Sequence, residues 1–177
     1  MDGGNDVSIE ILPEEGWSKV AHLHPLVYPP ENPHTAVWAA VQWADAEHRF
    51  VLSQDGQPVS HVALHIREGL TNGRPARIAG IGGVMTDPAH QGRGHARRLL
   101  ALAHEKAVAC HAAFAILVCE EKNVPFYAAQ DWRKFDGTMI HQQDGRSLGW
   151  NLSPVMVRDV VRRAPRRGMI DLRGKPW

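Results

Sequence analysis

One stretch, residues 80–100, constrains this chain most, and it reads GIGGVMTDPAHQGRGHARRLL. It begins as a glycine-rich apolar strand, turns at Asp87 and Pro88, and continues into a helix that we predict over residues 91–110. A helix N-terminus leaves its first amide hydrogens unpaired, and the macrodipole adds partial positive charge there. Glycines at 92 and 94 let a bulky anion approach, and nearby arginines add full charges. The stretch therefore predicts a pyrophosphate site between a strand and a helix.

The spacing within this stretch separates the families that build such sites. A Walker loop requires a Lys-Ser or Lys-Thr pair, and a dinucleotide fingerprint requires a third glycine directly after the first strand. Neither is present. Instead, Gln91, Gly94 and Ala96 fill the defined positions of Q/R-x-x-G-x-G/A, which resembles motif A of the GNAT superfamily of acyl-CoA-dependent N-acyltransferases. The alternative is a glycine-rich helix start that binds no ligand.

The resemblance implies that acetyl-CoA is the cosubstrate. Its contacts would come from the end of the strand, the following helix start and one tyrosine further along the chain. No metal site is predicted, because the eleven histidines show no HExxH-type spacing and the two cysteines form no metal-binding pattern. The implied cofactor-binding residues are Val84, Met85, Thr86, Gln91, Gly92, Arg93, Gly94, His95, Ala96, Arg97 and Tyr127.

The order of the predicted elements agrees with the GNAT fold. We expect a mixed α/β domain over residues 1–177, with a mostly antiparallel sheet of six to seven strands, a splayed parallel pair formed by the fourth and fifth strands, and about four helices. The segment 153–177 is expected to close on the acceptor site, and its basic run 158–167 is read as a solvated helix end or loop. Periodicity and turn residues place strands at 7–12, 50–52, 59–66, 76–81, 114–119, 133–141 and 146–152, and helices at 13–24, 35–46 and 91–110.

A second segment carries the predicted chemistry. Pro125, Phe126, Tyr127 and Trp132 resemble the GNAT segment P-F-Y-x-x-x-G-W, although Asp131 replaces the usual glycine. The resemblance implies that Tyr127 is the acid beside the departing thiolate; the alternative is a core tyrosine. It further implies that a backbone amide at Val84 or Met85 polarises the thioester carbonyl, and that Gly82 and Gly83 mark a bulge where the strands splay.

The general base is less clear from the sequence. Many GNAT members use a glutamate on the fourth strand, and the aligned residue here is Gly82. Glu120 is the candidate that we favour, acting through water at the end of the fifth strand. Glu121, His141 and Asp144 stay open, as does a water chain to bulk solvent.

The acceptor is predicted from weaker signals. An aromatic and acidic rim near residues 31–47 could wall a pocket. The Phe126–Trp132 segment, the Asp-Gly turn at 144–145 and the ending D-L-R-G-x-P-W together look like the aminoglycoside 2′-N-acetyltransferases, in which a terminal tryptophan and its carboxylate enter the drug pocket. Because Gly82 and Lys175 make this pocket less acidic, a drug with fewer amines, kasugamycin, is expected. The implied acceptor-binding residues are Glu31, Trp38, Trp43, Asp45, Gly82, Asp144 and Trp177.

Composition limits the other function classes. The net charge of +1 gives no reason to expect nucleic acid or membrane as a partner, and no apolar run approaches the roughly 20 residues of a membrane span. The acidic start MDGGNDVSIEIL lacks signal-peptide features, so a cytoplasmic protein is expected. The resemblance is compatible with a homodimer. Two other functions stay open: acetylation of a polyamine, small amine or protein amine, and a non-catalytic acyl-CoA sensor.

Overall fold

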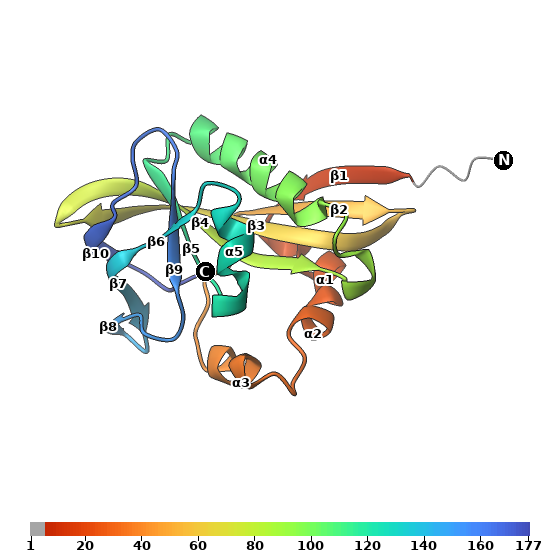
Figure 1. The fold of residues 1–177 in the computed structure, drawn as a ribbon, viewed down its shortest axis with the longest axis horizontal. Helices are drawn as coiled ribbons and strands as arrows, with labels where there is room; N and C mark the ends of the chain where they lie inside the picture. The colour runs from red at the N-terminus through yellow and green to blue at the C-terminus, as the bar shows by residue number, and fades with distance from the viewer. Residues whose placement is uncertain (1–5) are drawn as a thin grey trace.

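A computed structural model describes residues 6–177; residues 1–5, part of the acidic start considered above, lie outside them. The described chain forms one sheet of ten strands (Figure 1). Its main path runs β6-β9-β5-β4-β3-β10-β7-β8, and β1 and β2 extend from β3 as a branch. The strands are β1 (Val7–Leu12), β2 (His48–Gln54), β3 (Gln57–Thr71), β4 (Arg74–Thr86), β5 (Phe114–Val118), β6 (Arg133–Lys134), β7 (Asp136–Gln143), β8 (Arg146–Gly149), β9 (Val155–Asp159) and β10 (Arg167–Asp171).

Helices cover both faces of the sheet (Figure 1). The α4 helix buries Leu99, Leu100 and Ala103 in the cluster that contains Phe50 of β2. Side chains alternate along a strand, so the next residue, Val51, packs on the other face with α1 and α2. The helices are α1 (Trp17–Val20), α2 (Leu23–Val27), α3 (Pro33–Ala39), α4 (His95–Ala109) and α5 (Val124–Ala128), with 3-10 turns η1 (Glu14–Gly16), η2 (Pro88–His90) and η3 (Glu121–Asn123).

The parallel pair β4–β5 separates after a short contact. Only three residue pairs are in register, from Ile78↔Phe114 to Gly80↔Ile116, although β4 continues to Thr86. β5 instead stays paired with β9 up to Val118↔Val155. The pairs Met85↔His61 and Gly82↔Ala63 show that β4 advances three residues while β3 advances two. The predicted splay and bulge are both confirmed.

The predicted fold class is confirmed, but several boundaries and the number of strands are wrong. The expected helix 13–24 is η1, α1 and α2 in succession, and the helix predicted over 35–46 is α3, which ends at Ala39. The predicted strand 133–141 is divided into β6 and β7. β9 and β10 were not predicted; they flank the arginine-rich loop, where a helix end or loop was expected over 158–167. β9 gains its register from β5 and β6, so its pairing is not visible in the local pattern.

Candidate active site

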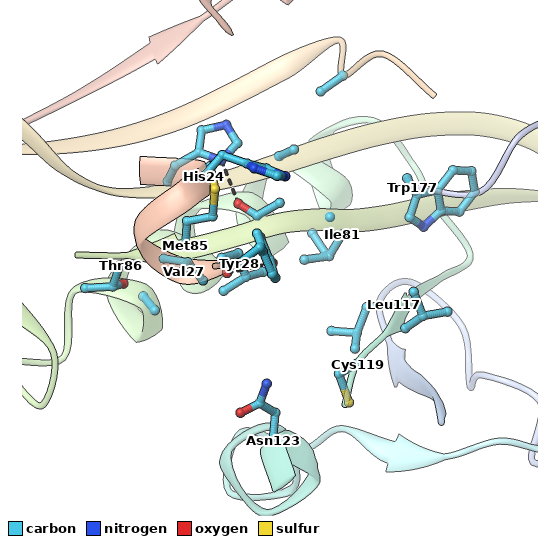
Figure 2. A pocket seen from close by; sticks show the side chains of 18 of the residues that line it. His24, Val27, Tyr28, Ile81, Met85, Thr86, Leu117, Cys119, Asn123 and Trp177 are labelled. Atoms are coloured by element: carbon cyan, nitrogen blue, oxygen red, sulfur yellow. Dashed lines mark hydrogen bonds between the residues drawn. The ribbon is translucent and has the colours of Figure 1, made fainter. Parts of the chain in front are cut away.

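A cavity of about 1150 Å³ follows β4 from its C-terminal end towards the point where β4 and β5 separate. Its walls come from β3, β4, the end of β5, the start of α4, α5 and the segment that contains α1, α2 and α3. Figure 2 shows Thr86 at one end of this cavity and Trp177 at the other, with Leu117 of β5 and Cys119, just after this strand, on the facing side. An extended ligand can therefore lie along β4 within the splay.

The predicted pyrophosphate site, residues 91–97, is called the cradle below and lies at one end of the cavity. It differs from the prediction, because α4 begins at His95 and residues 91–94 form a turn before it. Gly92 and Gly94 have φ of +76° and +79°, a left-handed conformation that L-residues rarely adopt. The Gln91 amide Nε2 donates to the carbonyl oxygen of Thr86 at 3.2 Å and fixes the turn on β4. The cavity is lined by every predicted cofactor residue except Arg93, which bonds to Gln54 and Ala89.

Gly94→Ala is expected to raise the KM for acetyl-CoA about tenfold, because an alanine at φ +79° would strain the turn and redirect its amides. Steady-state kinetics against acetyl-CoA measures this effect. Gly145→Ala is the matched control, since Gly145 has φ +71° and lies in the β7–β8 turn outside the cavity. Equal KM values in both variants would contradict a role for the Gly94 turn in donor binding.

Three side chains, which the sequence analysis did not identify, hold the carbonyl groups of the bulged part of β4. The His61 atom Nδ1 lies 2.6 Å from the carbonyl oxygen of Gly83, so Nδ1 carries the proton and donates. Ser60 Oγ donates to the carbonyl of Met85 at 3.1 Å, and the Tyr28 hydroxyl lies 3.5 Å from the carbonyl of Val84. These contacts fix the peptide planes whose amides are predicted to face the thioester. The only sequence signal was a polar Ser-His pair inside an apolar strand.

Two histidines are buried in this region without a carboxylate partner in direct contact. Burial lowers the pKa of His61 to about 4 and the pKa of His65 to about 3, and neighbouring arginines act in the same direction. His61 Nε2 lies 3.5 Å from Arg49 Nη1, which donates to it. Both rings are therefore neutral in the folded protein at physiological pH.

The protein is expected to lose stability as the pH falls from about 6.5 towards 4. In this window the unfolded chain protonates its histidines at about 6.5, whereas folded His61 and His65 stay neutral, so acid favours unfolding. Each histidine lowers the free energy of unfolding by about 2 kcal/mol between pH 7 and pH 4.5. Urea unfolding at the two pH values measures the loss, and His61→Asn, which keeps a donor for Gly83, should reduce it by about half. A flat profile would contradict this account.

Tyr127 is the predicted acid. It is on α5, is buried, and lines the cavity. Burial raises its pKa well above 10, and Tyr28 and Cys119 add to the effect, so the phenol stays protonated at all working pH values. Asp131 has φ +64° and takes the left-handed conformation that glycine usually provides after this segment. A protonated tyrosine that lines the cavity is compatible with the predicted acid, and the same residue belongs to the core cluster that contains Trp132.

Of the candidate bases, only Glu120 lines the cavity. Its side chain is buried, and its Oε2 atom lies 2.9 Å from Lys122 Nζ. Asn32 Nδ2, from the loop before α3, donates to Oε1 at 3.4 Å. The other candidates are occupied elsewhere: Glu121 pairs with Lys134, and His141 packs against Trp150.

The predicted acceptor wall is present in part. Trp38 and Trp43 are half-buried and line the cavity with Asp45, and Trp38 also contacts Tyr28 at a ring-centroid distance of 5.8 Å. Glu31 does not line the cavity and is exposed on the loop before α3.

Asp144 also lies outside the cavity. It accepts a hydrogen bond from Gln42 Nε2 at 2.6 Å. Its neighbour Gln143 donates to the carbonyl of Ala40 at 2.8 Å. The β7–β8 turn therefore supports the segment that carries Trp43, without itself reaching the cavity.

Trp177 and Gly82, which were both predicted to bind the acceptor, are in contact with each other. A Cβ atom on Gly82 would lie 2.8 Å from the main-chain carbonyl carbon of Trp177, and a Cβ on Gly80 would overlap its indole. The indole stacks on His65 at 5.5 Å, and the Arg67 guanidinium lies 4.6 Å above the ring. A glutamate at position 82, as in many GNAT members, has no space in this arrangement.

Within residues 6–177, no cluster of three or more His, Cys, Asp or Glu side chains is placed to hold a metal ion. None of the helices in the same range combines the length and apolarity that crossing a membrane requires.

The comparison with protein families agrees with this geometry. A family model described as an acetyltransferase (GNAT) domain matches residues 8–135. The chain belongs to the GNAT acetyltransferase family. The match covers the part of this GNAT protein from β1 to β6, with the cradle and Tyr127, while β7–β10 and Trp177 lie beyond it.

Solved structures share the GNAT fold at low identity. An N-acetyltransferase from Lactobacillus plantarum, described as putative, is 21% identical with a TM-score of 0.63, over 89% of this chain and 100% of that one. The Escherichia coli protein YhbS in complex with CoA is 13% identical with a TM-score of 0.61, over 97% and 92%. The aminoglycoside N-acetyltransferase AAC(6')-Iy in complex with CoA is 18% identical with a TM-score of 0.54, over 73% and 88%. No curated protein matches.

The family and the fold give this protein its reaction. It is an acetyl-CoA-dependent N-acetyltransferase, which moves an acetyl group from a thioester to an amine. The reaction needs a neutral amine, stabilisation of the carbonyl oxygen as it becomes negative, and a donor for the departing thiolate. Much of the rate comes from holding two substrates together, and one cavity that reaches from the cradle to the Trp38–Trp43 wall suits this requirement.

Proposed function

We propose that this enzyme acetylates an amino group of an aminoglycoside that carries few amines, namely the 2′-amino group of a kasugamycin-like compound, and so confers resistance to it. The observation that carries the proposal is the lining of the cavity away from the cradle. Trp38, Trp43 and Tyr28 present aromatic rings there, and Asp45 lies beside them. Aromatic faces suit the apolar side of a sugar ring, and carboxylates attract its ammonium groups.

The charge of the acceptor half favours a substrate with few positive charges. Glu14, Glu15, Asp45 and Glu120 are its side-chain carboxylates, but Glu120 is paired with Lys122. The buried Arg49 adds a positive charge to the same wall. A multiply charged deoxystreptamine drug would meet too few free carboxylates here.

The proposed mechanism assigns one role to each element of the site. The cradle and the amides near Val84 and Met85 hold the donor and polarise its carbonyl. Glu120 takes a proton from the acceptor amine through a water molecule, the neutral amine attacks the thioester carbon, and the C–S bond breaks as the tetrahedral intermediate collapses. Tyr127 protonates the departing sulfur, so CoA leaves as the thiol, and the tyrosine regains a proton from the nitrogen, which thereby becomes a neutral amide. Gly82 and Trp177 form the adjoining wall on the acceptor side.

The proposal is tested by the rank order of acceptors. Kasugamycin, deoxystreptamine aminoglycosides, polyamines and peptides with free N-termini are compared by kcat/KM with acetyl-CoA as the donor. We expect kasugamycin to rank first, with a product acetylated on the 2′-nitrogen by tandem mass spectrometry. A higher kcat/KM for a polyamine or a peptide would contradict the proposal and identify that class of amine as the acceptor.

A further inference from the structure

At the inner end of the cavity, Trp177 also fills a position that its proposed place in the acceptor wall does not explain. β4 has no side chains at Gly80 and Gly82, and the space above them is filled by Trp177. The indole is buried, and its Nε1 donates to the carbonyl of Ile116 at 3.3 Å. Ile116 is the last β5 residue in register with β4. The ring therefore sits where the splay begins, at the closed end of the cavity opposite the cradle (Figure 2).

We propose that the Trp177 indole is the floor of the acyl site and restricts the enzyme to short acyl-CoA donors. A thioester that faces the amides near Val84 directs its acyl carbons along β4, away from the cradle. Two residues of strand, from Val84 to Gly82, span about 7 Å. Beyond them the acyl chain meets Trp177, so an acetyl group fits and an acyl group as long as hexanoyl collides with the ring.

The floor is held rigidly, as a length restriction requires. His65 stacks on one side of the indole, at an interplanar angle of 21°. Arg67 donates from Nη1 to the carbonyl of Lys175 at 2.6 Å and its guanidinium covers the ring. Pro176, the residue before Trp177, is joined to the segment 42–44, because Ala44 N donates to the carbonyl of Pro176 at 2.7 Å. Contacts from β3 and from the acceptor wall thus fix the ring over Gly80.

The test measures acyl-CoA binding without any acceptor, so it does not depend on the proposed substrate. Dissociation constants for CoA, acetyl-CoA, butyryl-CoA and hexanoyl-CoA are measured by calorimetry for the wild type and for Trp177→Ala. In wild type, hexanoyl-CoA should bind at least about tenfold more weakly than acetyl-CoA, since a single misfitting methylene costs about tenfold or more. The ratio of these two dissociation constants is called the gap below. Trp177→Ala should remove the gap and leave the dissociation constant of CoA itself little changed.

Matched variants separate a length restriction from general loosening. Trp150 belongs to the same buried cluster but does not line the cavity, so Trp150→Leu should keep the wild-type gap while Trp177→Leu narrows it. Gly80→Ala should also narrow the gap by displacing the indole, and should add nothing in the Trp177→Leu background. Should Trp177→Ala fail to fold, Trp177→Leu and Gly80→Ala decide the outcome. An unchanged gap in the Trp177 variants, or equal narrowing in Trp150→Leu, would overturn the proposal.

Discussion

Tyr127→Phe is expected to lower kcat about 100-fold and to leave the dissociation constant of CoA nearly unchanged. The substitution removes one buried hydroxyl from the cavity wall and keeps the ring that packs against Trp132. Because burial raises the pKa of Tyr127 well above 10, the phenol stays protonated at every practical pH, as the proposed donor to the departing sulfur must. In the proposed mechanism the cradle and the amides near Val84 and Met85 hold the acetyl-CoA, and the substitution does not touch them. Single-turnover kinetics and calorimetry with CoA separate the two quantities.

Tyr28→Phe is the control for this experiment. Tyr28 is the only other tyrosine of the chain and lines the same cavity, and burial raises its pKa to about 12. Its hydroxyl faces the carbonyl of Val84 at 3.5 Å, so it supports the bulge. We expect a loss of only several-fold. A wild-type kcat in Tyr127→Phe would remove that residue from the mechanism. An equal loss of kcat in the two variants would mean that Tyr127 only lines the cavity.

Glu120→Gln should lower kcat about 100-fold near neutral pH, because glutamine keeps the shape but cannot take a proton. The ion pair with Lys122 and the contact from Asn32 hold the carboxylate in the cavity wall. The deficit should shrink as the pH rises, since the acceptor amine then becomes neutral without a base. A pH–rate profile from pH 6 to 9.5 measures both effects.

Glu121→Gln provides the comparison for that profile. Glu121 is the next residue, but it is exposed and pairs with Lys134 outside the cavity. It should behave as wild type. A parallel loss in both variants, or no loss in Glu120→Gln, would point to a water chain as the route for the proton.

The cradle could be predicted because its requirements are local. A turn with two left-handed glycines, followed by a helix, leaves a short fixed spacing from Gln91 to Ala96. The splay was predictable for a similar reason, because consecutive glycines in a strand signal a bulge. Even here the predicted helix start was four residues too early. The glycines that suit an anion site adopt a left-handed conformation, so the helix begins only after them.

Residues that act through distant partners could not be found in this way. His61 of β3 and Tyr28, the residue after α2, hold the carbonyls of β4, and those contacts exist only once the chain has folded. Glu31 and Asp144 show the opposite case. Their residue type suited an acceptor site, but Asp144 is bonded to Gln42 and neither side chain lines the cavity. A match to a sequence motif shows which residues are adjacent along the chain, but it does not show which side chains are in contact in the folded protein.

Acceptor-dependent release of CoA thiol from acetyl-CoA, followed with kasugamycin and with deoxystreptamine aminoglycosides, polyamines and peptides, tests the central claim most directly. This account predicts rapid thiol release with kasugamycin, matched by one acetyl group gained on the acceptor and abolished to within about 1% by Tyr127→Phe. Tight CoA binding without thiol release for any amine of the panel would contradict it, and would identify the protein as an acyl-CoA sensor that kept the cradle and lost the chemistry.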